Sequence, residues 1–387
     1  MLWTGALISN AGTWLQTVAQ GWLILQLTNS SFLLGLVNAV GTAPVMTLAL
    51  FGGVLADQFD RRRLLIIAQI GLMVFTLIMA ALVDVHVITV AWLLTLVLLI
   101  GVASALSGPT WQSFLSDLVP DEVLLNAIAL NSAQFNVARV LGPAMAGTLI
   151  VLIGIAGCFT LNGLSFLAVI VALLMMHRPL RERVPRRQTP WHSLVEGVRY
   201  TVHHPEARAI MSLATVHTIF GMPFLMLMPV FARDVYHGTA GDLGIFLAAM
   251  GAGAVAGALM TARFGAVRRQ GLLILGLEVA FALALILFAH MPSRATALLA
   301  LALVGFFMVS FFAFANTVLQ ILSDEAVRGR VMSIWTVASW GITPVGSLWA
   351  GAVAARLGAP SVLTLGAGVC LAYTAVIAVA APRLRRL

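Results

Sequence analysis

The stretch "GGVLADQFDRRRLL" at Gly52–Leu65 decides the fold, because it is a short charged gap in a very apolar chain. An apolar run ends at Asp57, three arginines follow at Arg61, Arg62 and Arg63, and apolar sequence then resumes. A gap of this kind is typical of the loop between two helices that cross a membrane. The question is whether the rest of the chain repeats this organisation.

The composition of the whole chain predicts a membrane protein. Apolar residues make up 61% and charged residues 9% of the 387 residues, and the mean hydropathy is +1.02. A soluble domain carries about 25% charged residues. The net charge of +8 does not indicate a nucleic-acid-binding protein, because the arginines form short clusters between apolar runs. Cys158 and Cys370 lie inside separate apolar runs and fit neither a disulfide framework nor a metal site.

Helices, rather than barrel strands, account for the apolar runs, because these runs are long and do not alternate with polar residues. A helix needs about 20 residues to cross a bilayer. The sequence therefore predicts an all-α polytopic membrane protein with twelve transmembrane helices. The predicted spans are 3–27, 32–56, 64–83, 87–116, 124–153, 156–177, 208–232, 241–262, 271–290, 296–322, 331–356 and 361–381.

The arginines orient these spans. Alternate loops and the C-terminal tail hold 18 of the 22 arginines, and the opposite loops hold three, Arg233, Arg294 and Arg356. Because positive loops stay in the cytoplasm, both termini and the long central loop are predicted to be cytoplasmic.

The central loop divides the chain into three parts. We predict an N-terminal six-helix bundle over 1–177, a cytoplasmic linker with an amphipathic helix over 178–207, and a C-terminal six-helix bundle over 208–387. The helix in the linker has an apolar stripe that suits the membrane interface. A solvated connector and a regulatory element both remain open for the linker.

The two bundles repeat each other at a nearly constant spacing. Asp121 and Asp324 each open a span, and Pro143 and Pro344 follow inside those spans. Duplicated halves of this kind are common in transporters, whose pathway lies between the repeats. The sequence therefore predicts two pseudo-symmetric six-helix halves.

The opening stretch resembles the signature loop of the major facilitator superfamily. The matching residues are Gly53, Leu55, Ala56, Asp57, Arg61 and Arg62, whereas Gln58 and Asp60 depart from the pattern. The stretches "GTWLQTVAQGWLILQLT", "RVLGPAMAG" and "VRGRVMS" are similar to the bacterial exporter branch that includes the enterobactin exporter and macrolide-efflux relatives. The resemblance covers the whole chain and implies a secondary transporter of the bacterial cytoplasmic membrane that works by alternating access.

Asp57 is the charge in the opening stretch that membrane topology does not explain, since acids contribute little to orientation. We predict that Asp57 docks on the start of span 331–356, with its positive helix end and Arg328 or Arg330. This contact would form when the cytoplasmic side of the transporter is closed, and it would therefore act as a gate. The resemblance implies the same gate, with Gly53, Arg61 and Arg62 in its motif. A purely topological role remains the alternative.

A second cytoplasmic contact follows from the repeat. The loop after span 241–262 has Thr261 where the first half has Asp57, but it keeps Arg263, Arg268 and Arg269. These arginines are predicted to pair with a cluster of acids before span 124–153. The acids are Asp117, Asp121 and Glu122.

Two charged residues lie well inside predicted spans, where a charge is costly and functional by default. Arg139 shares a helix face with Asn136 and is predicted either to bind a polar or anionic group in the pathway or to form a structural ion pair. Glu278 is the acid in the middle of a span and a candidate for carrying a proton. A pairing with a neighbouring arginine is its alternative.

His217 is the second proton-coupling candidate, because histidine titrates near neutral pH, although a buried structural histidine is the common alternative. The small residues Gly142 and Gly147, with Pro143 between them, are similar to the antiporter motif of the superfamily and are predicted to pack helices closely.

Polar residues inside the spans must face protein or water. They are predicted to line the substrate pathway, and helix–helix hydrogen bonding is the alternative for about half of them. Together with aromatic residues they suit an amphipathic substrate. The predicted substrate-binding or cavity residues are Asn10, Thr13, Gln16, Gln20, Asn38, Asn136, Arg139, Asn316 and Trp335.

These features predict a transporter and not an enzyme. No phosphate-binding loop for ATP and no His/Glu metal spacing is present in the sequence, so we expect no cofactor and no metal. The predicted function is proton-coupled export of an amphipathic small molecule, drug-like or siderophore-like, by a monomer in the lipid bilayer. An importer or facilitator is the alternative on the same fold. From other functional classes, the alternatives are a non-transporting membrane sensor and a lipid translocase. A sensor would keep its signalling after loss of Arg139 and Glu278, whereas an exporter would not keep its transport.

Overall fold

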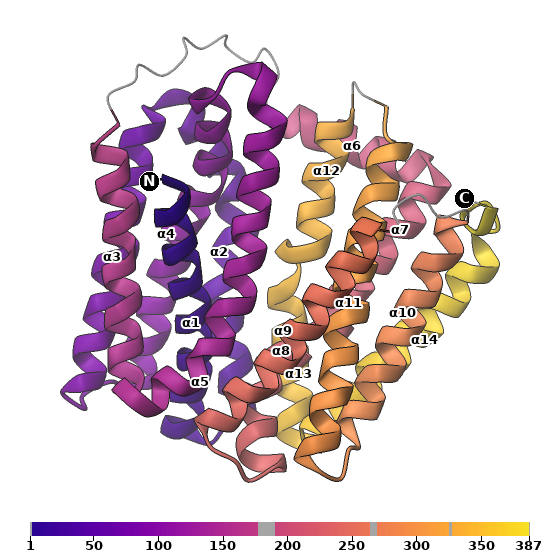
Figure 1. The fold of residues 1–387 in the computed structure, drawn as a ribbon. Coiled ribbons are helices and arrows are strands. Elements are labelled where there is room, and N and C mark those ends of the chain that lie inside the picture. Colours follow the sequence, from indigo (N-terminus) through magenta and orange to yellow (C-terminus); the bar gives the residue numbers. More distant parts are fainter. Residues whose placement is uncertain (1, 177–189, 264–268, 325–326, 387) are drawn as a thin grey trace. The chain divides into compact units, whose positions relative to one another are not determined.

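The fold is a set of long helices in a computed structural model of the chain (Figure 1). The structure describes residues 2–176, 190–263, 269–324 and 327–386; at positions 49–58, 116, 121, 125, 190–196 and 386 it describes only the backbone. Every regular element in these residues is helical. The prediction of an all-α protein is confirmed.

Fourteen α-helices and four short helices of other types follow one another in the described residues. The α-helices are α1 Leu2–Thr28, α2 Ser31–Gln58, α3 Arg61–Asp84, α4 Val90–Leu118, α5 Asp121–Leu174, α6 Pro190–His203, α7 Pro205–Val216, α8 Phe224–Val230, α9 Ala240–Arg263, α10 Gln270–Ala289, α11 Arg294–Leu322, α12 Arg328–Thr336, α13 Thr343–Leu357 and α14 Ala359–Ala380. The π-helices η1 His217–Gly221, η2 Phe231–Val235 and η3 Val337–Gly341 and the 3₁₀-helix η4 Leu384–Arg386 complete the order.

Nine helical segments of the described chain are long and apolar enough to cross a membrane. They are 31–48, 61–84, 90–115, 122–174, 205–235, 240–263, 270–289, 294–322 and 359–380. The longest is broken at Gly154, where φ is 72° and ψ is 175°. That conformation favours glycine, which has no Cβ, so the break divides α5 into two helical segments. The chain is thus a multi-pass membrane protein.

Short polar caps start the helices that follow tight loops. The side chain of Asp60 accepts a hydrogen bond from the backbone N–H of Arg63 at 2.8 Å at the start of α3. Thr89 caps α4 and Ser293 caps α11 in the same way. Such caps satisfy backbone donors that the first turn leaves unpaired, and they let the chain reverse within a few residues.

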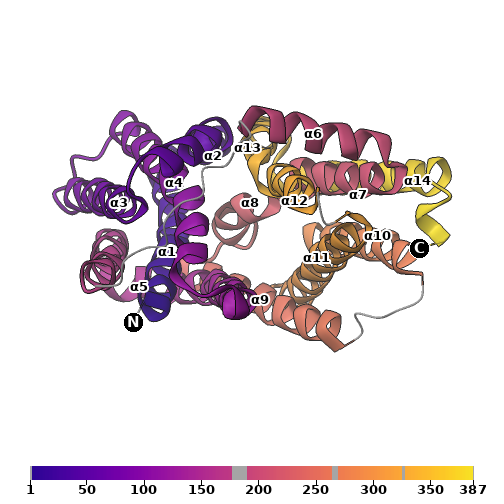
Figure 2. The ribbon, with the colours of Figure 1, turned by 90° about the horizontal axis from the view of Figure 1, so that it is seen from above.

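The chain divides into two compact units. Unit 1 contains 1–29, 40–190 and 239–244, and unit 2 contains 30–39, 191–238 and 245–387. In unit 1, α1 packs along α5 and α3 packs against both α4 and α5; Figure 2 shows α1 beside α5.

Both segments of α5 contact α1 at glycines. A Cβ at Gly5 would lie 3.0 Å from the carbonyl oxygen of Ala168, and a Cβ at Gly142 would clash with Trp14 and the backbone at Ala11. The break at Gly154 therefore lets one continuous stretch of chain pack twice against the same helix.

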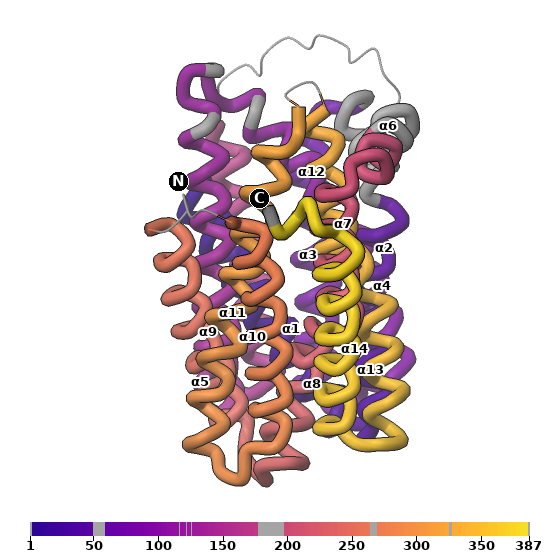
Figure 3. Tube along the Cα trace, turned by 90° about the vertical axis from the view of Figure 1, so that its right-hand side faces the viewer, coloured from indigo at the N-terminus to yellow at the C-terminus, as the bar shows by residue number. Residues whose placement is uncertain are grey.

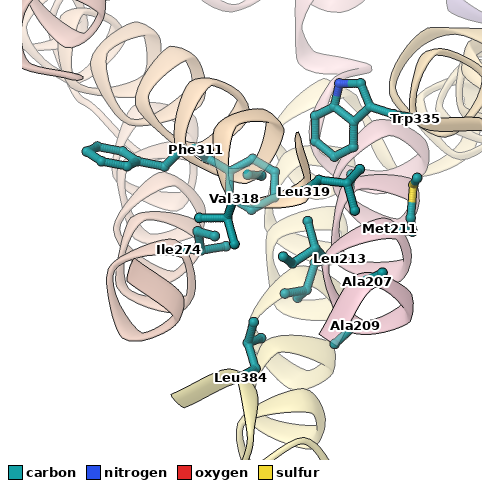
Figure 4. Packing of buried hydrophobic residues seen from close by; sticks show 14 of the residues in the cluster. Ala207, Ala209, Met211, Leu213, Ile274, Phe311, Val318, Leu319, Trp335 and Leu384 are labelled. Atoms are coloured by element: carbon teal, nitrogen blue, oxygen red, sulfur yellow. The ribbon is translucent and has the colours of Figure 1, made fainter. Parts of the chain in front are cut away.

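In unit 2, α10 lies between α11 and α14, as the orange and yellow tubes of Figure 3 show. Its core combines buried apolar residues from α7, α10, α11, α12 and η4. Figure 4 shows several of them, including Phe311, Leu319 and Trp335. Burial of a Leu or Phe side chain contributes about 1.5–3 kcal/mol, so this cluster holds the five elements together.

Two short segments join the unit that does not contain the rest of their helix. The start of α2 clusters with unit 2, where a Cβ at Gly35 would lie 3.0 Å from Cα of Gly351 on α13. The start of α9 clusters with unit 1, where a Cβ at Gly244 would lie 2.8 Å from Cα of Gly147 on α5. Both contacts need glycine because the two backbones touch.

Candidate functional site

A histidine and a glutamate meet in the interior of unit 2. The Nδ1 atom of His217 lies 2.7 Å from the Oε2 atom of Glu278, and the two side chains are 0% and 1% exposed. His217 begins η1, and Glu278 lies in the first half of α10. The two residues that the sequence indicates as separate proton-coupling candidates therefore form one buried pair.

Aromatic rings surround the imidazole of His217. The ring of Phe281 lies 4.2 Å from it between centroids, and the ring of Phe311 stacks on it at 4.9 Å. Phe312 presents its ring nearly at right angles, also at 4.9 Å. Such a shell keeps water away from the pair and strengthens the electrostatic interaction between its members.

The polar groups that reach this pair are few. The thiol of Cys370 on α14 interacts with the carboxylate of Glu278, and the buried Nε2 atom of His217 has no hydrogen-bond partner among the described residues. A site this apolar disfavours an unbalanced charge. A pair that holds one exchangeable proton is neutral overall, whereas loss of that proton leaves a net negative charge that needs water or a cation.

A π-helical turn positions His217. The backbone N–H of Met222 donates to the carbonyl oxygen of His217 at 2.9 Å, which closes the wide turn of η1. The hydroxyl of Thr218 donates to the carbonyl oxygen of Ser339, in the π-helix η3, at 3.2 Å. Single π turns inside longer helices often mark functional positions, and here two of them meet beside the His217–Glu278 pair.

Unit 1 contains a buried polar network centred on Gln16 of α1. The Oε1 atom of Gln16 accepts hydrogen bonds from Asn162 at 2.5 Å and from Thr76 at 3.2 Å. Ser165 donates to the side chain of Asn162 at 3.0 Å. These contacts join α1, α3 and α5, so for Gln16 they favour helix–helix hydrogen bonding, the alternative to a place in the pathway.

An ion pair joins α3 and α4 at the end of unit 1 where α3 begins. The Nη1 atom of Arg61 lies 2.6 Å from the Oδ2 atom of Asp117 and also donates to the carbonyl oxygen of Ser113. Arg62 donates to the carbonyl oxygen of Leu174 at 2.9 Å. Asp117 thus has a partner inside unit 1, whereas the sequence predicts pairing with the arginines that follow span 241–262.

Other parts of the predicted gate are described only in part. The side chains of Asp57 and Asp121 and the whole of Arg268 lie outside the described part of the chain, as does the stretch 177–189 of the linker, and Gly53 is described by its backbone alone. Arg328 begins α12, and Arg330 follows within its first turn.

The remaining predicted pathway residues have varied surroundings. Asn38 accepts a hydrogen bond from Ser347 of α13 at 3.0 Å. Trp335 is buried in the core of unit 2. Arg139 lies midway along the first segment of α5, and Asn10 and Gln20 are half-buried on α1. Three predicted pathway residues form side-chain hydrogen bonds within their own helix. Thr13 donates to the carbonyl oxygen of Ser9, Asn136 donates to that of Ser132, and Asn316 accepts from the side chain of Gln320.

Sequence reasoning missed several of these groups. Thr76, Asn162 and Ser165 are polar residues inside apolar helices, and that feature alone could have marked them as partners for Gln16. Phe312 cannot be recognised from the sequence, because one phenylalanine in an apolar helix does not indicate a site until its neighbours in the fold are known. Among the described residues no group of three His, Cys, Asp or Glu side chains could hold a metal ion.

The comparisons with known proteins agree with this architecture. The profile of the family described as "Transmembrane secretion effector" matches residues 1–386. The chain is 26% identical to the multidrug efflux pump Tap of Mycolicibacterium fortuitum, over 99% of this chain and 95% of that protein. It is 28% identical to the enterobactin exporter EntS of Shigella boydii serotype 4, over 86% of this chain and 80% of that protein.

A solved structure gives the same fold. The chain resembles a bacterial homologue of the human lysosomal transporter Spinster in an inward-facing conformation, with a TM-score of 0.69. The match covers 99% of this chain and 94% of that protein at 17% identity.

Proposed function

Because this chain belongs to the transmembrane secretion effector family of the major facilitator superfamily, we propose that this transporter exports an amphipathic small molecule in exchange for protons. Two relatives with matches over most of the chain carry the names of a multidrug efflux pump and an enterobactin exporter. Their names support export as the direction and an amphipathic compound, drug-like or siderophore-like, as the cargo.

The observation that carries the proton coupling is the buried pair of His217 and Glu278. The pair can gain or lose one proton, and its surroundings favour the neutral state. The pair without this proton carries a net negative charge, which needs water or a cation beside it. A conformational cycle that wets the pair on each side of the membrane in turn would therefore load a proton on one side and release it on the other.

The twelve-span topology belongs to the same proposal. The described residues contain nine apolar segments, the break at Gly154 divides the longest into two, and α1 and the run α12–α13 would complete twelve. We place 1–177 and 208–387 in two six-helix halves and 178–207 in a cytoplasmic linker. The protein is a monomer in the bacterial cytoplasmic membrane, with both termini in the cytoplasm.

The predicted gate and pathway complete the mechanism. Asp57 docks near Arg328 or Arg330 when the cytoplasmic side is closed, and Arg61, held by Asp117, stabilises the loop that carries Asp57. Arg139, Asn136 and Asn316 contact the cargo, together with Asn10, Thr13 and Gln20 of α1.

Flux measurements in proteoliposomes test this function. A panel of amphipathic drugs and iron chelators is loaded into vesicles, and their release is followed with and without an inward proton gradient. At least one compound should leave faster with the gradient, and a protonophore should remove the difference. Protein-free vesicles are the control. If no compound in the panel shows gradient-dependent release, the antiport proposal fails, and gradient-driven uptake would indicate an importer.

A further inference from the structure

A pair of stacked aromatic side chains in unit 2 lies beside the buried His217–Glu278 pair. The rings of Phe312 on α11 and Trp340 on η3 are nearly parallel, with an interplanar angle of 19° and centroids 6.4 Å apart. Phe312 is half-buried, and Trp340 is 38% exposed. Part of the stack is therefore accessible to another molecule.

The position of Trp340 along its helix is unusual for a tryptophan. It lies in the middle of the run 328–357, away from both ends. In membrane proteins tryptophan gathers at the two interfaces, where the indole N–H meets head groups. A partly exposed tryptophan at mid-membrane depth needs a different reason.

The stack lies on the polar side of α11, away from its exposed leucines. Leu303 is exposed, and it precedes Phe312 by about 2.5 helical turns, which places the two on opposite sides of the helix. Asn316 and Gln320 follow Phe312 at intervals of four, and the hydrogen bond between them shows that they share a face. Amide side chains avoid lipid and face protein or water.

The second helix presents polar groups on the same side as Trp340. Ser333 and Thr336 of α12 are exposed and precede Trp340 by about two turns and about one turn, respectively. Their hydroxyls donate to the backbone carbonyls of Gly329 and Met332, which leaves their oxygen atoms able to accept hydrogen bonds. Amide groups from α11 and hydroxyl groups from α12 thus flank one aromatic surface.

We propose that Trp340 and Phe312, flanked by Asn316, Gln320, Ser333 and Thr336, bind the planar aromatic ring of the transported molecule. The inference rests on the proposed transport function and names a chemical class for its cargo. Stacking selects an aromatic ring over a saturated ring of similar size, while the amides and hydroxyls bind polar groups on the rim of that ring. None of the six side chains is charged, so the site selects for the ring and not for the sign of the charge.

Phe312 links this site to the proton-carrying pair. One side of its ring stacks on Trp340, and its edge contact with His217 is 4.9 Å between centroids. A bound ring that shifts Phe312 changes the packing around His217. From the other elements packed near His217, the titratable groups that face the pair are Glu278 itself on α10 and Cys370 on α14; α11 and η3 contribute aromatic rings and backbone there.

Two ligands and three variants test the site. The ligands are amphipathic tertiary amines that differ only in a naphthyl or a decahydronaphthyl group. Binding to the purified protein in detergent is measured by titration calorimetry, and gradient-driven flux of both amines is measured in proteoliposomes. Trp340→Leu removes the aromatic ring, and Trp340→Phe keeps one. Trp349→Leu is the matched control, because Trp349 makes an edge-to-face contact with Phe220 elsewhere in unit 2.

The wild-type protein should bind the naphthyl amine more tightly, by about two- to tenfold, the factor expected for one aromatic contact. Trp340→Leu should lose this preference, whereas Trp340→Phe and Trp349→Leu should keep it. Equal affinities in the wild-type protein, or an unchanged preference in Trp340→Leu, would overturn the aromatic site. Gradient-driven flux without any aromatic preference would overturn this inference alone. A binding preference that depends on Trp340, without gradient-driven flux, would support the aromatic site and contradict the proposed antiport.

Discussion

At the scale of single residues, the His217–Glu278 pair makes each member depend on the other. A buried charge that loses its partner destabilises a protein by about 3–5 kcal/mol, whereas replacing both partners with apolar residues is often neutral. Glu278→Leu should therefore lower the thermal unfolding temperature in detergent more than the double variant His217→Phe, Glu278→Leu does.

Additive effects of the two substitutions would contradict this prediction. If the double variant unfolds at a temperature lowered by the sum of the two single effects, the side chains do not interact, and the 2.7 Å contact does not stabilise the fold. Leu319→Ala, in the core of unit 2, is a control. The cavity that it creates should lower the unfolding temperature by the same amount in the single and the double variant.

The pair of Arg61 and Asp117 gives a second prediction at this scale. Arg61 has two partners, the carboxylate of Asp117 and the carbonyl oxygen of Ser113. Arg61→Gln should therefore lower the unfolding temperature more than Asp117→Asn. The charge-reversed double variant Arg61→Asp, Asp117→Arg should recover part of the loss. Equal effects of the two single variants, with no recovery in the reversed pair, would contradict this contact.

Several candidate site residues could be identified from the sequence, but their partners could not. Glu278 and His217 are evident as titratable groups in apolar spans, and Gln16 is evident as a polar residue in the first span. Their partners lie 61 residues away for His217 and 146 for Gln16. Such contacts depend on how the helices pack, and helical periodicity contains no information about packing between distant spans.

At the scale of helices, glycines divide into those that touch another backbone and those that face open space. A Cβ at Gly253 of α9 would clash with the backbone of Ala302 of α11, whereas a Cβ at Gly276 of α10 would meet nothing within 4 Å. Gly253→Ala should therefore push α9 from α11 and lower the unfolding temperature. Gly276→Ala should raise it, because alanine favours a helix by about 0.5–1 kcal/mol over glycine. Similar effects of the two substitutions would show that α9 and α11 are not in close contact.

Helix positions were largely predictable, because long apolar runs separated by short polar gaps leave little choice. The predicted gap between spans 124–153 and 156–177 coincides with the break at Gly154. The π turns at η1 and η3 were not predictable, because one extra residue in a turn leaves the apolar pattern almost unchanged. His217 is the first residue of η1, so the candidate site includes a feature that periodicity does not reveal.

At the scale of the whole molecule, the proposed topology places the loop before α3 in the cytoplasm and the loop after it outside. Phe59 and Val87 are exposed in these two loops, and the native cysteines Cys158 and Cys370 are buried. On intact cells a membrane-impermeant maleimide should label Val87→Cys directly, and Phe59→Cys only after permeabilisation. The unmodified protein is the control for background labelling. Labelling of Phe59→Cys alone on intact cells would reverse the topology.

The two units contain different buried polar groups. Unit 2 contains the His217–Glu278 pair, which we propose carries the proton, and the aromatic surface beside it. Unit 1 contains an internally satisfied polar network around Gln16. We therefore expect substitutions in the network to affect stability more than coupling. Gln16→Leu should lower the unfolding temperature while the number of protons exchanged per transported molecule stays unchanged, as measured with a pH-sensitive dye in the vesicles. A changed proton ratio would place Gln16 in the coupling mechanism.

The most direct test of the proposed function compares wild-type protein and Glu278→Gln in proteoliposomes, with one transported compound from the flux panel. Release driven by an inward proton gradient is measured beside exchange of the same compound at equal pH on both sides. Glu278→Gln should retain exchange, because the amide keeps the shape of the site. It should lose gradient-driven release by at least about tenfold, the factor that corresponds to ~1.4 kcal/mol. Gradient-driven release at the wild-type rate would contradict the claim that the His217–Glu278 pair carries the proton.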